Sequence, residues 1–224
     1  MLTARKIYKQ INTLTAELIQ TGLCDAQNFP SINRYSGNIE EVGISTSDHS
    51  IFLKSLPYTE MFIKLNENRM YNIKMIDGAL ISFFYRFKNR ELISHRLSFF
   101  PSPDLESFQN EPELYFGDDL YIDILDKRIV TVPIRFDFNS DEAVFEPITH
   151  PISHLTLGQY ENCRVPVAAA LTPYQFLSFI IINFYHTAHT KYNSQFSICK
   201  DSFEETIFNE ERAMLHMQTP IHRA

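Results

Sequence analysis

Residues 71–100, YNIKMIDGALISFFYRFKNRELISHRLSFF, have the pattern of three β-strands separated by two tight turns. The segments 71–76, 79–88 and 91–100 are rich in isoleucine, phenylalanine and tyrosine, which favour the pleated, half-buried surface of a sheet. Asp77-Gly78 and Asn89-Arg90 stand between them, and such short spacers are typical of β-hairpins. The centre of the fold is therefore predicted to be a meander of antiparallel strands.

The second hairpin turn also predicts which side chains share a face. It places Lys88 opposite Glu91, and uninterrupted pairing from there sets Phe84 opposite His95. Arg86 and His95 are then diagonal neighbours on one face of the sheet, among apolar side chains.

Helical patterns precede this meander. Apolar residues recur at helical spacing from Thr3 to Gly22, and glycine is a good helix stop, so an amphipathic helix is predicted there. A second helix is predicted over residues 58–69, where the apolar residues fall on one face. The intervening residues 28–38 contain proline, asparagine, serine and glycine, and predict a loop.

Alternation of apolar and polar residues returns in the second half of the chain. In residues 129–138 the apolar side chains alternate with polar ones that include Arg135 and Asp137, which predicts a strand with one dry and one wet face. Residues 119–125 alternate likewise, and a three-residue turn between the two strands sets Asp119 opposite Arg135. Further short strands are predicted over residues 143–148 and 155–157.

The C-terminal part is predicted to be helical. Thr172-Pro173-Tyr174-Gln175 has the form of a capping box with proline at the first helical position. The helix over 173–186 is apolar nearly all round, so we expect it to be buried against the sheet, and a final helix is predicted over 202–217. The prediction is one α+β domain over residues 1–224, with a mostly antiparallel sheet. Its parts are a mainly helical region (1–70), the sheet (71–170) and C-terminal helices (171–224).

Composition excludes several classes of protein. The 224 residues carry a formal charge of −7, which argues against a protein wrapped in nucleic acid and leaves only a local basic patch for RNA. The three cysteines form no CxxC pair, which favours a reducing, cytoplasmic location without disulfides or structural zinc. No signal peptide or membrane-spanning segment is predicted, and the common phosphate-loop, hydrolase and dinucleotide motifs are not found.

One polar motif has the residue types of a phosphodiester-cleaving site. Arg135 and Asp137 on the wet strand face are followed by His150, His154 and Arg164. Two histidines can divide the general base and general acid roles near neutral pH, while arginine stabilises charge on a phosphate. Extended chain would hold the two histidine Cα atoms about 13 Å apart, so a shared site requires a bend between them.

The same motif allows two other interpretations. Arg135 would simply pair with Asp119 or Asp137, and the histidines would bond backbone carbonyls, as in an ordinary structural network. Alternatively, His150, His154 and one of the two aspartates would match the two-histidine, one-carboxylate pattern of a metal site. The favoured prediction contains no metal and no cofactor.

A second basic group belongs to the hairpin. Positive charge next to aromatic rings would form a small platform for nucleic acid or another anion, with Arg86 and His95 as candidate substrate-binding residues. The ordinary alternative is a buried hydrogen-bonded pair of Arg86 and His95 beside a solvated turn. The group comprises Arg86, Lys88, Arg90, His95 and Arg96.

Several runs of residues resemble an uncharacterised bacterial family catalogued as a domain of unknown function. The runs are HRLSF at 95–99, PSPDLE at 101–106, PIRFD at 133–137, HPISHLTLGQY at 150–160 and CRVP at 163–166. The resemblance extends from about Tyr8 to Tyr185, and the family's function is not established. Locally, Arg135-Phe136-Asp137 and His150-Pro151-x-x-His154 are similar to segments of some small bacterial toxin proteins, which implies ribonuclease-like activity.

Two functions are therefore expected. The first is a toxin- or defence-type protein that cleaves RNA. In it, His150 and His154 transfer protons, Arg135 and Arg164 bind phosphate, and Asp137 orients a histidine. The second is a non-catalytic interaction subunit that binds a co-encoded protein through the helix 202–217, whose apolar residues exceed one narrow core-facing stripe.

Overall fold

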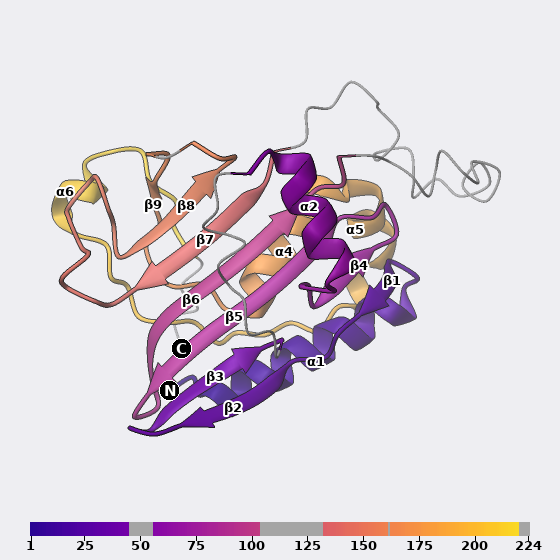
Figure 1. Ribbon diagram of the computed structural model, residues 1–224, viewed down its shortest axis with the longest axis horizontal. Helices are drawn as coiled ribbons and strands as arrows, with labels where there is room; N and C mark the ends of the chain where they lie inside the picture. The colour runs from indigo at the N-terminus through magenta and orange to yellow at the C-terminus, as the bar shows by residue number, and fades with distance from the viewer. Residues whose placement is uncertain (45–55, 104–131, 161, 220–224) are drawn as a thin grey trace.

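The structure, a computed structural model, describes residues 1–44, 56–103, 132–160 and 162–219, and has helices on both faces of one open sheet (Figure 1). In these residues the sheet has nine antiparallel strands in the order β1-β4-β5-β6-β7-β8-β9, and the β2-β3 hairpin joins it beside β5. This arrangement confirms the predicted α+β class with its mostly antiparallel sheet. The strands are β1 (Cys24–Gln27), β2 (Ser31–Tyr35), β3 (Ile39–Gly43), β4 (Ile73–Met75), β5 (Leu80–Lys88), β6 (Glu91–Phe100), β7 (Ile134–Asn139), β8 (Ser153–Leu157) and β9 (Val165–Pro166).

The helices α1 and α4 form the layer behind the sheet in Figure 1. The predicted N-terminal helix is confirmed as α1 (Ala4–Gln20), which begins after the N-cap Thr3 and buries an apolar stripe in the main core. On the opposite face of the sheet, α2 (Tyr58–Glu67) covers Leu80 and Phe100 in a smaller cluster.

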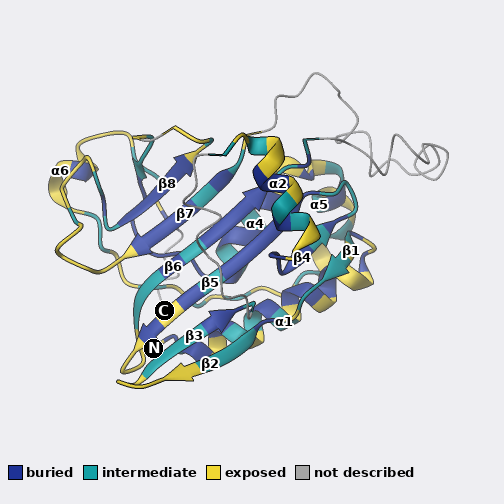
Figure 2. Cartoon of the chain, in the orientation of Figure 1, coloured by how far each residue is buried: buried dark blue, intermediate teal, exposed yellow. Residues whose placement is uncertain are grey.

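The predicted buried helix is α4 (Pro173–Phe184), and its capping box is formed as expected. The Thr172 hydroxyl accepts a hydrogen bond from the Gln175 N–H, and the Gln175 side chain accepts one from the Thr172 N–H. Phe176 of α4 packs edge-on against Phe83 and Phe136 of the sheet, with ring centroids 5.8 and 5.9 Å apart. Figure 2 shows the resulting core as a dark blue band along β5 and β6. Two short α-helices follow, α5 (His186–Tyr192) and α6 (Asn209–Arg212).

The central hairpin has the predicted turn but not the predicted register. Asn89 and Arg90 both have positive φ, and Lys88 faces Glu91 as expected. Pairing then shifts by one residue, because Ile93 is an extra residue on β6. Such a bulge moves every following side chain to the other face. His95 therefore lies opposite Tyr85 instead of Phe84, and the predicted placement of Arg86 and His95 on one face is wrong.

Three further predictions of local structure are wrong. Residues 28–38 are not simply a loop, because they contain β2, which pairs along its length with β3. Residues 143–148 form turns with a single bridge, and not a strand. In the segment 202–217 only α6 is helical, since Thr206 and Ile207 instead donate backbone hydrogen bonds to the Ala168 carbonyl.

Some predictions fall outside the described residues. These are the strand at 119–125, the first part of the strand at 129–138, and the carboxylate of Asp119. Within the described part of the chain, no helix combines the length and the apolar character needed to cross a membrane.

Candidate functional site

Strand alternation gives the middle of the sheet one apolar and one polar face. Leu97, Phe136 and Leu155 face the core formed with α1 and α4. The opposite side, called the polar face below, carries two cross-strand rows on β6, β7 and β8. One row consists of Arg96, Asp137 and His154, and the other of Ser98, Arg135 and Thr156.

Asp137 joins two arginines from neighbouring positions of the sheet. Arg96 Nε donates to Asp137 Oδ1 at 2.9 Å, and Arg135 Nε donates to Asp137 Oδ2 at 2.5 Å. Burial opposes ionisation of this carboxyl, but the guanidiniums of Arg96 and Arg135 outweigh burial and hold its pKa below the ordinary value. Asp137 is therefore ionised at neutral pH and holds both arginines in place.

Two histidines lie beside this carboxylate. His154 Nδ1 is 2.8 Å from the Pro151 carbonyl oxygen, so the neutral ring carries its proton on Nδ1. Its Nε2 points towards Asp137, 3.9 Å from Oδ2, and burial lowers the pKa of the ring. The His150 and His154 ring centroids are 5.4 Å apart, so the two side chains meet the requirement of proximity that a shared site imposes. His154 is thus a buried base with an unprotonated Nε2, next to the more exposed His150.

Arg164 lies close to the same group. Its Nη1 donates to the Thr149 carbonyl at 3.3 Å, and its charge contributes to the lowered pKa of His154. The group contains one carboxylate, that of Asp137, and three guanidiniums, those of Arg96, Arg135 and Arg164. It therefore carries two excess positive charges when the histidines are neutral. This local excess contrasts with the chain's formal charge of −7.

The other predicted site residues lie elsewhere. Arg86 pairs with Glu41 of β3, with 3.3 Å between Nε and Oε1, while Arg90 is at the exposed hairpin tip. His95 lies on the apolar face, where Nε2 accepts a hydrogen bond from the Leu171 N–H at 3.1 Å. Burial lowers the pKa of His95 to about 4. The structure therefore does not bring Arg86 and His95 to the group around Asp137.

The sequence placed Arg96 among the basic hairpin residues of a candidate RNA-binding patch but not as a partner of Asp137, and Ser98 and Thr156 were not singled out. Arg96 alternates with the apolar Leu97, which indicates that it lies on a polar face. The bulge at Ile93 changes which side chains of the neighbouring strands share that face, and the sequence does not reveal the bulge. No three His, Cys, Asp or Glu side chains gather to hold a metal ion in the residues that the structure describes. The metal interpretation thus has no geometric support among them.

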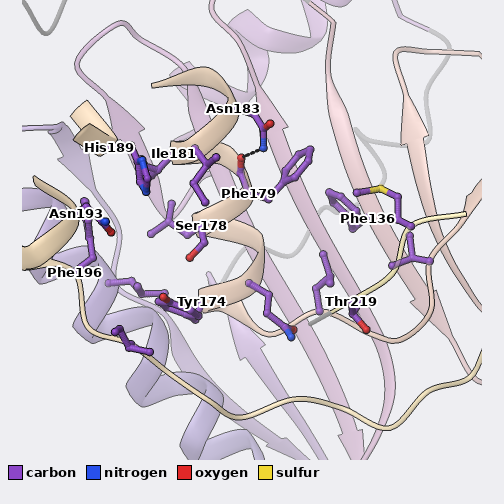
Figure 3. Close-up of a pocket in the computed structure, with 18 of the residues that line it drawn as sticks. Phe136, Tyr174, Ser178, Phe179, Ile181, Asn183, His189, Asn193, Phe196 and Thr219 are labelled. Atoms are coloured by element: carbon purple, nitrogen blue, oxygen red, sulfur yellow. Dashed lines mark hydrogen bonds between the residues drawn. The ribbon is translucent and has the colours of Figure 1, made fainter. Parts of the chain in front are cut away.

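A different kind of surface lies on the other side of the sheet. A mainly apolar pocket of about 370 Å³ lies along α4, and its lining contains no aspartate, glutamate, lysine or arginine. Figure 3 shows Phe136 on one side of α4, and His189 and Asn193 on the other. Strand β7 therefore contacts both surfaces, with Phe136 towards the pocket and its two neighbours Arg135 and Asp137 on the polar face.

Comparison with known proteins identifies a family. A search of curated proteins and a search of solved structures each found no match. The predicted resemblance to a family of unknown function is confirmed by a family model that matches residues 23–219, a range that includes the whole site. The chain belongs to the family described as "Uncharacterized conserved protein (DUF2290)".

Proposed function

We propose that the polar face binds and cleaves a phosphodiester of RNA, as in a toxin- or defence-type ribonuclease. The observation that carries this proposal is the pairing of Arg96 and Arg135 with one buried carboxylate beside two histidines. Arginine is suited to phosphate because its planar guanidinium matches two phosphate oxygens at once.

The arginines retain donors for a ligand. Each uses Nε for Asp137, so the edge formed by its two terminal nitrogens points away from that bond. The side chains of Arg96 and Arg135 are 30% and 31% exposed, which leaves this edge within reach of a bound anion. Asp137 thus acts as a positioning residue for a cationic site.

The histidines have the chemistry for the proton transfers. His154 Nε2 would accept the proton of the RNA 2′-hydroxyl as its oxygen bonds to phosphorus. His150, in its protonated form, would donate a proton to the 5′-oxygen as the phosphorus bond to that oxygen breaks. Asp137 lies 3.9 Å from His154 Nε2 and would stabilise the imidazolium formed in the first transfer. The arginines would stabilise charge on the phosphate.

RNA titration at two salt concentrations tests the binding step. Three guanidiniums predict a log-log slope near −2, at about 0.7 per phosphate contacted. Arg135→Ala should weaken binding and reduce that slope by about 0.7. Arg86→Ala is the matched control, since Arg86 is a strand arginine paired with Glu41 outside the site. Salt-independent binding, or equal binding by wild type and Arg135→Ala, would contradict the proposal.

Cleavage of a labelled single-stranded RNA tests the chemistry. His154→Ala of verified folding should lose activity by about 100-fold or more, the usual contribution of a general base. His186→Ala removes an exposed histidine on α5 and should leave the rate unchanged. If His154→Ala cleaves RNA as fast as wild type, the assigned role is wrong.

A second candidate function is the non-catalytic interaction subunit, and the mainly apolar pocket along α4 favours it. Ile182 and Ile198 on its lining are 46% and 76% exposed, an apolar surface of the kind that binds a partner. Its expected occupant is an apolar segment of a co-encoded protein. Light scattering of the mixture should show a complex that Ile182→Asp disrupts and Thr190→Asp, on the exposed surface of α5, does not.

A further inference from the structure

Two adjoining hollows lie at one end of the sheet, where the tips of the β2-β3 and β5-β6 hairpins meet (Figure 1). Asn38 and Asn89 join the two tips through a side-chain hydrogen bond and a backbone hydrogen bond, each of 3.1 Å. The hollows have volumes of about 410 and 640 Å³ and share the side chains of Arg34, Glu40 and Arg90. Together they are called the tip groove below.

The tip groove carries excess positive charge. Its charged lining residues are Arg5 of α1, Arg34 of β2, Glu40 of β3 and Arg90 of the hairpin turn. Arg34 Nε donates to Glu40 Oε1 at 3.1 Å, so the two terminal nitrogens of this guanidinium take no part in that bond. In the described part of the chain, neither Arg5 nor Arg90 makes an ion pair. Three guanidiniums against one carboxylate make the groove attractive to an anion.

Arg90 occupies a backbone position that favours glycine. Its φ is +72°, and Asn89 before it also has a positive φ, as in the two-residue hairpin turn whose second residue is commonly glycine. A side chain in this conformation costs free energy, and the exposed Arg90 recovers none of it by burial. A guanidinium that binds a ligand gives the arginine a reason to be there.

The shape of the tip groove favours a chain-like ligand. Arg34 faces the start of α1, whereas Tyr35, the next residue of the edge strand β2, points to the other side of the sheet. The groove therefore passes round the edge of the sheet. The side chain of Arg34 is 78% exposed and Tyr35 is 53% exposed, so both are open to solvent. Positive charge beside open aromatic rings is typical of surfaces that bind single-stranded nucleic acid.

We infer that the tip groove is a second contact for single-stranded RNA. Arg5, Arg34 and Arg90 bind phosphates along the strand, and Tyr35 stacks on a base. The inference rests on the proposed function for the identity of the polymer, but binding here requires no cleavage. Strand β2 is separated from β6 by β3 and β5, which is roughly 15 Å, so one long strand can reach both the groove and the polar face.

Titration with RNA strands of two lengths tests the inference. A strand of about four nucleotides is long enough for one site only. Its log-log slope with salt should be about −2, because either site offers three guanidiniums at about 0.7 per phosphate contacted. A strand of about 20 nucleotides should reach both sites and give a slope of about −4. Equal slopes for the two lengths would overturn the inference.

The variant Arg90→Gly separates RNA binding from stability. Glycine suits the positive φ at this position, so the variant should unfold at the wild-type Tm or above. Its slope for the long strand should nevertheless be less steep by about 0.7, and that of Arg5→Gln/Arg90→Gly by about 1.4. Lys88→Gln is the matched control, since it removes an exposed positive charge from the same hairpin outside the groove. Its slope should equal that of the wild type.

The outcomes distinguish this inference from the proposed function. If the double variant binds the long strand with the wild-type slope while the wild type cleaves RNA, only the tip groove is refuted. If the double variant loses slope as expected and the wild type does not cleave RNA, only the proposed function is refuted. A free nucleoside triphosphate that competes for the groove more tightly than the long strand would show a site for a compact anion, which would also overturn the inference.

Discussion

The imidazole of His95 is buried between Tyr85 and Phe138, with ring centroids 5.5 and 5.8 Å away. Burial lowers its pKa from 6.5 to about 4, so the ring stays neutral in the folded protein over a range where the unfolded chain binds a proton. Together with Tyr85, whose hydroxyl donates to the Leu171 carbonyl, it fixes the residue before the N-cap of α4. Its role is therefore to position α4.

This pKa shift predicts a loss of stability in acid. As pH falls from 6.5 towards 4, the unfolded state gains a proton that the folded state does not, so the free energy of unfolding decreases. Between pH 7 and pH 5 His95 should account for about 2 kcal/mol of that decrease. His154, with its lowered pKa, acts in the same direction, whereas burial raises the pKa of Asp77, which acts in the opposite one.

Urea denaturation at the two pH values checks the prediction, with His95→Gln as the variant. Glutamine offers an oxygen to the Leu171 N–H but does not titrate, so the variant should lose most of this pH dependence. An unchanged pH dependence in His95→Gln would show that other groups are responsible.

At the scale of single elements, the capping box of α4 predicts a measurable stabilisation. Thr172 is fully buried, and its hydroxyl accepts a hydrogen bond from the Gln175 N–H at 3.2 Å. Replacing an N-cap hydroxyl by alanine typically costs about 1 kcal/mol. Thr172→Ala should therefore unfold at lower urea concentration than Thr172→Ser, which keeps the hydroxyl and loses only the methyl group. Equal stabilities would mean that the cap contributes nothing to this helix.

The elements that sequence predicted well are those with local signals. The capping box at Thr172 and the turn at Asn89-Arg90 depend on neighbouring residues, so both could be identified from the sequence. The bulge at Ile93 has no such signal, since inserting one residue leaves alternation intact on either side. The segment 202–217 is likewise held by backbone bonds to Ala168, distant in sequence, which override its local helical pattern.

At the scale of the whole molecule, the sequence predicted part of the site. Alternation in 129–138 correctly placed Arg135 and Asp137 on one face. His150 and His154 were identified as candidates, but the bend that brings them together was a condition that their spacing did not predict. The partnership of Arg96 with Asp137 could not be predicted, because it requires the order of strands β6 and β7 and the register shift at Ile93. Long-range pairing brings together residues 41 positions apart, and no local pattern encodes it.

The two faces of β7 predict that stability and binding can be separated. Phe136 is 1% exposed and packs edge-on against Phe176 and Phe179 of α4, so Phe136→Ala should cost about 3 kcal/mol of unfolding free energy. Its folded fraction should still bind RNA with wild-type affinity. Arg135→Ala should instead weaken binding and change the free energy of unfolding little, because the Arg135 side chain is partly exposed and Asp137 retains its bond to Arg96. Denaturation and RNA titration on both variants make the comparison. If Arg135→Ala were as destabilising as Phe136→Ala and bound RNA normally, the network around Asp137 would be a structural element of the sheet, and its arginines would have no role in binding.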